Sequence, residues 1–193
     1  MSFFRASTWS EPVVPAIEGG GVVLRTPHSD DYGAWAELRT ASREFLAPWE
    51  PAWAADELSR NAFRRRLRRY SRDLREDSAY PFFLFRAADS VLIGGLTLSN
   101  VRRGVAQTAS LGYWMGRPYA GQGHMSAAVA ALVPFAFEHL RLHRVEAACV
   151  PTNQASIRVL EKCGFEREGY ARDYLCINGV WADHLLFGRV RLT

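Results

Sequence analysis

A glycine-rich segment, AGQGHM at residues 120–125, has the composition of a phosphate-binding turn. Glycines at positions 121 and 123 let the backbone turn its N–H groups toward a ligand, and the helix expected after them adds free amides and the positive end of its dipole. We therefore expect an anion site that suits a pyrophosphate. A dinucleotide-binding G-x-G-x-x-G motif would need a third glycine where Ser126 stands, and the Gly-Lys-Ser/Thr of a P-loop does not occur. A flexible loop before a helix would have the same composition.

A second group of polar residues lies in NQASIRVLEKCGF at 153–165, directly after a short apolar segment. On a helix, Asn153 and Ser156 lie near one side because they are three residues apart. Asn153 could cap this helix, or its amide could contact a ligand lying between neighbouring strands. Ser156 is either a small packing residue or a proton donor. The residues alone leave both alternatives open.

The elements that must position these residues follow from the spacing of apolar side chains. Strand-like segments are expected at 22–26, 81–87, 91–100, 107–116, 144–150, 165–177 and 179–190. Helices are expected at about 30–39, at about 54–74, after Gly123 and at about 153–162. Residues 43–53 are expected to form an extended loop because they contain Pro48 and Pro51. This order predicts one α+β (α/β) domain with a mixed sheet over residues 22–193, preceded by an N-terminal arm over residues 1–21.

Composition excludes several classes of protein. The chain has 193 residues, of which 48% are hydrophobic, so it can bury the core of one domain. No apolar run reaches the ~18 residues of a membrane span, and the first residues lack a secretory signal, so we expect no membrane partner. The three cysteines lack the spacing of metal ligands, which argues against a zinc module or a disulfide scaffold. We expect no metal site and a cytoplasmic location.

Basic residues are concentrated in one expected helix. Eight arginines fall within residues 60–75, namely Arg60, Arg64, Arg65, Arg66, Arg68, Arg69, Arg72 and Arg75. Such a helix could contact nucleic acid or an acidic partner. It could equally be a solvated face that pairs with Asp73, Glu76 and Asp77.

Two longer segments, considered together, resemble a known family. LGYWMGRPYAGQGHMSAAV and NQASIRVLEKCGFEREGY are similar to motifs A and B of the GNAT superfamily of acyl-CoA N-acyltransferases. Within it they resemble most the RimJ/RimL-like ribosomal-protein N-terminal (alanine) acetyltransferases, and REFLAPWEP upstream fits this subgroup. The resemblance runs from about Val22 to Val190. It implies the GNAT fold, a mixed and mostly antiparallel seven-strand sheet that splays between its fourth and fifth strands and is flanked by about four helices.

The resemblance also implies an activity. Such an enzyme transfers an acetyl group from acetyl-CoA to a primary amine by direct attack in a ternary complex, without a metal. An α-amine has a pKa of ~7.7–8.0, against ~10.4 for lysine, so a protein N-terminus needs only a weak base. The subgroup implies a ribosomal protein as acceptor, and the arginine-rich helix at 60–75 could then contact ribosomal RNA. The oligomeric state, monomer or homodimer, stays open.

Two alternatives to this activity remain. The first is a GNAT enzyme that acetylates a small-molecule amine, such as an antibiotic or a polyamine, because the scaffold does not choose the acceptor. The second is a non-catalytic protein that senses CoA or binds RNA. The tyrosine that many family members use as general acid would fall on Leu160, and a carboxylate that some carry on the fourth strand would fall near Ser110. These two departures keep the second alternative open.

By the same resemblance, particular residues of this chain would bind acetyl-CoA. The backbone of Trp114 and Met115 would pair with the pantetheine arm, and Asn153 would contact that arm. The backbone amides of one loop would hold the pyrophosphate, those of Gly121, Gln122, Gly123, His124, Met125 and Ser126.

Two residues are expected to handle protons. Glu50, which the family resemblance places beside the acceptor groove, is the candidate base, and Ser156 is the candidate proton donor. Trp49 would form a wall of the acceptor pocket. Glu50 could instead be a surface charge, and Trp49 could be simple packing.

Overall fold

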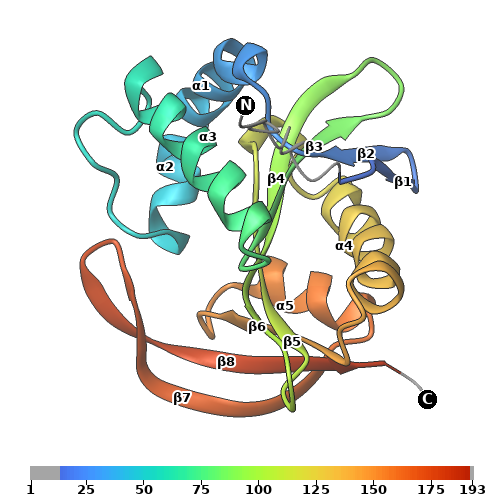
Figure 1. Cartoon of the computed structure of the whole chain (residues 1–193). Coiled ribbons are helices and arrows are strands. Elements are labelled where there is room, and N and C mark those ends of the chain that lie inside the picture. The colour runs from blue at the N-terminus through green and yellow to red at the C-terminus, as the bar shows by residue number, and fades with distance from the viewer. Residues whose placement is uncertain (1–13, 192–193) are drawn as a thin grey trace, which may run out of the picture.

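The computed structural model describes residues 14–191, which form a single mixed sheet flanked by helices on both faces (Figure 1). The strand order is β1-β2-β3-β4-β5-β6-β8-β7, and all neighbouring strands are antiparallel except β5 and β6. The strands are β1 (Ile17–Gly19), β2 (Val22–Arg25), β3 (Tyr80–Arg86), β4 (Val91–Arg102), β5 (Thr108–Met115), β6 (Arg144–Cys149), β7 (Glu166–Ile177) and β8 (Val180–Val190). The helices are α1 (Tyr32–Ala41), α2 (Arg43–Leu46), α3 (Arg60–Arg75), α4 (His124–Pro134) and α5 (Gln154–Lys162).

The predicted mixed, mostly antiparallel α+β architecture is confirmed, but the count of seven strands is wrong. The additional strand is β1, which pairs with β2 and lies within the predicted N-terminal arm. Its apolar residue Ile17 packs against the main core, and α4 covers it, so this short segment gains by joining the sheet edge. Residues 1–13 of the predicted arm lie outside the described part of the chain.

Both faces of the sheet are covered, which explains the uninterrupted apolar sequence of β3. Alternate residues of a strand point to opposite faces. Phe82 and Leu84 belong to the core beneath α4, whereas Phe83 and Phe85 belong to a second cluster with residues of α1 and α3. Figure 1 shows α1, α2 and α3 on one side of the sheet and α4 on the other. Every side chain in this strand's interior is therefore buried.

The segment between α1 and α3 differs from the expected extended loop. Residues 43–46 form the single-turn helix α2, because Leu46 is buried and Pro48 occupies a position in the following 3₁₀ turn where its missing N–H costs nothing. The long helix α3 begins at Arg60 rather than near Ala54. Ser59 fixes this start, since its side chain accepts a hydrogen bond from the N–H of Ala62 at 3.1 Å.

The arginine-rich helix α3 is amphipathic. Phe63 is buried against the sheet, and most of its arginines are exposed. The carboxylates that pair with the arginines of α3 belong mainly to the segment that precedes this helix. Asp56 binds Arg65 at 2.5 Å, and Glu57 binds Arg66. The expected pairing with Asp77 is wrong, because Arg103 lies beside that carboxylate and takes it, with two nitrogen–oxygen contacts of 2.6 Å. Asp73 lies 4.0 Å from Arg72.

Candidate functional site

The sheet splays where β5 and β6 diverge. These parallel strands are paired from Thr108 and Arg144 only as far as Leu111 and Ala147, although β5 continues to Met115. On its other side β5 stays paired with β4 along its whole remaining length. Residues 112–115 therefore have one free strand edge, as the family resemblance predicted.

An open pocket of about 420 Å³ lies at this splay. It collects residues from four regions: the α2 segment, β5, the start of α4 and the start of α5. All the predicted site residues except Gln122 line it. They are Trp49, Glu50, Trp114, Met115, Gly121, Gly123, His124, Met125, Ser126, Asn153 and Ser156.

The start of α4 forms one end of the pocket and has the geometry of an anion site. Gly123 is the helix N-cap with a φ of 83°, a backbone conformation that glycine adopts at little cost. A Cβ at this position would meet no atom within 4 Å, so the backbone here is open on the pocket side. The first intrahelical hydrogen bond runs from the N–H of Ala127 to the carbonyl of Gly123, at 3.0 Å. The amides of residues 124–126 precede it, and no side chain caps them.

Gln122 lies on the same turn but outside the pocket lining. Its side-chain amide donates to the carbonyl of Pro118 at 2.8 Å, which braces the turn. The side chain is thus occupied in holding the loop, and only its backbone remains for the predicted role.

The free edge of β5 carries particular backbone groups. The N–H of Gly116 donates to Ile93 of β4 at 2.8 Å. Because N–H groups alternate in direction along a strand, those of Met115 and Tyr113 point to the opposite, unpaired edge. The backbone of Trp114 then faces β4. This alternation favours Met115 and Tyr113 over Trp114 as backbone partners for a bound ligand.

Asn153 caps α5, as one of its two interpretations predicted. Its side-chain oxygen accepts the N–H of Ser156 at 3.0 Å. The cap uses the oxygen of the amide, so the NH₂ group is the part that can donate to a ligand in the pocket.

A contact that the sequence did not reveal joins β5 to α5. The hydroxyls of Tyr113 and Ser156 lie 2.7 Å apart, and both residues line the pocket. Burial raises the pKa of Tyr113 above its ordinary value, so its hydroxyl stays protonated and can donate at any working pH. The missing family tyrosine at Leu160 is no guide to this pair, since Leu160 is fully buried in the core. The available signal was the alternation of side chains along β5, which places Tyr113 on the opposite face of the sheet from Trp114, the face that includes residues of α4 and α5.

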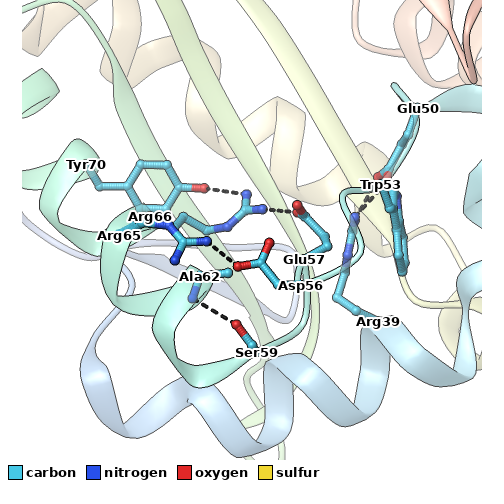
Figure 2. Close-up of polar contacts among 10 residues, drawn as sticks. All are labelled: Arg39, Glu50, Trp53, Asp56, Glu57, Ser59, Ala62, Arg65, Arg66 and Tyr70. Atoms are coloured by element: carbon cyan, nitrogen blue, oxygen red, sulfur yellow. Dashed lines mark hydrogen bonds and ion pairs between the residues drawn. The ribbon is translucent and has the colours of Figure 1, made fainter.

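Glu50 lies at the edge of the pocket in a tight ion pair with Arg39. Each carboxylate oxygen is 2.7 Å from a different guanidinium nitrogen, and Trp53 donates its indole N–H to Oε2 at 2.8 Å (Figure 2). The guanidinium of Arg39 lies 4.3 Å from the Trp53 ring centre and 4.9 Å from that of Trp114. Oε1 accepts one hydrogen bond, which leaves it one lone pair for another donor. The carbonyl of Glu50 also accepts the N–H of Asn178 in the β7–β8 turn, at 2.8 Å.

A second pocket, of about 500 Å³, adjoins the first. The two share three residues, Glu50, Tyr113 and Trp114, so they meet at the free edge of β5. The second pocket is bounded by residues of α1, the segment before α3, α3 itself and β3 to β5. Its lining is Trp35, Arg39, Glu50, Pro51, Ala52, Trp53, Glu57, Arg66, Arg69, Tyr70, Phe83, Gly95, Thr97, Gly112, Tyr113 and Trp114. Trp49, the predicted wall of the acceptor pocket, lines the first pocket and not the second.

Neither a metal-ligand cluster nor a membrane-spanning helix occurs within residues 14–191. No group of three or more histidine, cysteine, aspartate or glutamate residues there has the arrangement of a metal site. No helix in the same range is long and apolar enough to cross a membrane.

Comparison with known proteins gives consistent matches over most of the chain. Residues 22–166 match the family described as "Acetyltransferase (GNAT) domain". A Bacillus subtilis (strain 168) protein named "Probable N-acetyltransferase YjcK" is 42% identical over 87% of this chain and 93% of its own length. The "[Ribosomal protein uS5]-alanine N-acetyltransferase" of Escherichia coli (strain K12) is 35% identical over 86% of this chain and 85% of its own length.

Solved structures agree with the sequence matches. Mycobacterium smegmatis RimJ, in complex with CoA-disulfide, superposes with a TM-score of 0.85 and is 31% identical. The match covers 94% of this chain and 88% of that one. With the splayed sheet and the open start of α4, these matches establish that the chain belongs to the GNAT family of acetyltransferases.

Proposed function

We propose that this enzyme transfers the acetyl group of acetyl-CoA to the α-amine of a protein N-terminus, with a ribosomal protein as acceptor. The observation that carries the proposal is the meeting of two pockets at the free edge of β5, which can bring a thioester and an amine together. The relatives support the choice of substrates. The E. coli relative acts on an alanine of ribosomal protein uS5, and M. smegmatis RimJ binds CoA as a disulfide.

The first pocket fits acetyl-CoA. The uncapped amides at the start of α4 provide donors for a pyrophosphate, next to the positive end of the helix dipole. The free N–H groups of Tyr113 and Met115 offer strand-like hydrogen bonds to an amide-containing arm. The NH₂ group of Asn153 can donate from the opposite wall.

The second pocket would admit the amine. Attack on the thioester carbonyl forms a C–N bond and breaks the C–S bond, so the amine must lose a proton and the departing sulfur must gain one. One of the two free N–H groups, that of Tyr113 or that of Met115, would stabilise negative charge on the carbonyl oxygen, and the other would pair with the amide-containing arm. We propose Glu50 as the group that accepts the amine proton, through the remaining lone pair of Oε1, directly or by a water molecule.

Ser156 would deliver a proton to the sulfur. Its hydroxyl needs a partner that donates to it as it gives its own proton away, and Tyr113 lies at the required distance of 2.7 Å. Tyr113 is then a positioning residue that acts through Ser156. This pair takes the place of the family tyrosine that is absent at Leu160.

Contact with ribosomal RNA through α3 stays a prediction. What supports it is that several arginines of this helix are exposed, namely Arg64, Arg72 and Arg75.

The test is release of free CoA thiol from acetyl-CoA with three sets of acceptors. These are peptides with a free N-terminus, N-blocked peptides that contain lysine, and small amines. We expect turnover only with free N-termini. Turnover confined to small amines would overturn the acceptor while leaving the cofactor pocket intact. Binding of acetyl-CoA without turnover on any acceptor would favour a CoA-sensing protein.

A further inference from the structure

The second pocket contains an unequal number of opposite charges. Three arginines and two glutamates line it. Arg39 is neutralised by Glu50, and Arg66 is neutralised by Glu57 (Figure 2). Arg69 is left over: within residues 14–191, no carboxylate lies within 4.0 Å of its guanidinium.

Arg69 is held at the pocket by its place on α3. It follows Arg66 by three residues, so the two side chains lie on the same face of the helix. Its guanidinium lies 5.6 Å from the ring centre of Tyr70, another lining residue. The side chain is exposed, so it can meet an incoming ligand without displacing protein contacts.

A second observation comes from Arg39 in the same lining. This residue is only 6% exposed, and its Nε is a buried polar atom with no hydrogen-bond partner among the described residues. An unsatisfied buried donor costs free energy, so such groups usually have a ligand or water as partner. Because this Nε is enclosed by protein atoms, the group that the pocket presents to a ligand is the unpaired positive charge of Arg69. That charge favours a negatively charged ligand.

We propose that the second pocket selects acceptors with an acidic side chain close behind the N-terminal residue, and that Arg69 is the charge partner of that side chain. This inference rests on the proposed N-terminal acetylation and adds the substrate class. A carboxylate would compensate the surplus charge of the pocket, whereas a lysine would add to it. Arg69 acts in specificity and takes no part in the transfer of the acetyl group.

The test is a panel of peptides with one free N-terminus and a single aspartate, asparagine or lysine scanned through positions 2 to 5. For the wild-type enzyme we expect aspartate to exceed asparagine in kcat/KM by about 1.5- to 5-fold at the best position, the range for an exposed ion pair. The difference should lie in KM. It should shrink as salt is raised, because exposed charges are screened.

Variants identify the residue responsible. Arg69→Gln should equalise the aspartate and asparagine peptides, and Arg69→Glu should reverse the order so that lysine is preferred. Arg68→Gln is the matched control, because Arg68 is exposed on the same helix but lines neither pocket, and it should keep the wild-type preference. Thermal unfolding of each variant checks that it is folded.

The outcomes separate this inference from the proposed function. Turnover on free N-termini with no preference for aspartate at any scanned position would overturn the inference and leave the function standing. A preference that survives Arg69→Glu would overturn the role of Arg69. Failure of every free N-terminus as acceptor would overturn the proposed function itself, and the inference with it.

Discussion

Removing the phenolic hydroxyl of Tyr113 tests whether proton delivery depends on the contact between β5 and α5. If Ser156 protonates the leaving sulfur, Ser156→Ala should lower kcat by about 100-fold or more, the lower end of the range for general acid catalysis. Tyr113→Phe keeps the ring and removes only the group that lies 2.7 Å from the Ser156 hydroxyl. One neutral hydrogen bond contributes about 0.5–1.5 kcal/mol, so we expect a loss of about 2- to 13-fold in kcat.

The double variant Tyr113→Phe/Ser156→Ala shows whether the two hydroxyls act together or separately. Because Tyr113 acts through Ser156, adding Tyr113→Phe to Ser156→Ala should lower kcat no further. The KM for acetyl-CoA should change little in any of these variants. Burial raises the pKa of Tyr113, so its hydroxyl stays protonated across pH 6 to 9, and the ratio of wild-type to Tyr113→Phe rates should be constant over this range.

The assay is initial-rate thiol release at saturating acetyl-CoA with one free-N-terminal peptide. Tyr32→Phe is the control, since its hydroxyl donates to the carbonyl of Leu58 at 3.1 Å and lines neither pocket. Independent, multiplicative losses from Tyr113→Phe and Ser156→Ala would refute the reasoning, because each hydroxyl would then act without the other.

Three further changes have calculable effects. Glu50→Gln removes the charge that neutralises the buried Arg39. We therefore expect the free energy of unfolding to fall by about 2–3 kcal/mol and the Tm in a thermal melt to fall by about 5–10 °C. An unchanged Tm would show that this ion pair contributes nothing to stability. Gly123→Ala places a Cβ on a residue with φ of 83°, at a cost of about 1 kcal/mol. Calorimetry should also show at least a 10-fold weaker binding of CoA, and unaltered binding would place the pyrophosphate elsewhere. Burial alone would raise the pKa of Asp31, but the hydrogen bonds from Arg25 outweigh it and hold that pKa below its ordinary value. The stability that the ionised Asp31 adds is therefore present above about pH 4 and is lost as the pH falls. The urea midpoints of the wild type and of Asp31→Asn should differ at pH 7 and converge below pH 4. A difference between the two midpoints that persists in acid would contradict the charge pairing.

Local sequence signals predicted much of the fold. The uninterrupted run of large apolar residues in β3 predicted a strand. Asn178 and Gly179, both with positive φ, form the turn between β7 and β8, where the strands expected at 165–177 and 179–190 meet. What escaped prediction was short and stabilised by distant contacts. β1 has three residues and depends on α4 to cover it, and α2 is one turn that depends on the burial of Leu46.

The lining of the first pocket was predictable because many of its residues are consecutive in the chain. Gly121 and Gly123 mark the turn, and the helix that follows supplies the amides whatever its side chains are. The roles of the candidate proton-transfer groups were harder to predict, because they depend on which side chains lie beside them in the fold. The sequence gives no sign that Glu50 is paired. In the structure its carboxylate accepts two hydrogen bonds from Arg39 and one from Trp53.

The splay between β5 and β6 links these observations physically. Had the two strands stayed paired beyond Leu111, the N–H groups of Tyr113 and Met115 would be used within the sheet and no edge would be free for a ligand. The same divergence leaves room for α5 to bring Ser156 against Tyr113, a contact between residues 43 positions apart. It also lets the two pockets share Glu50, Tyr113 and Trp114. In the proposed mechanism, one interruption of the sheet therefore exposes the backbone for one substrate, assembles the proton donor and opens the route for the other substrate.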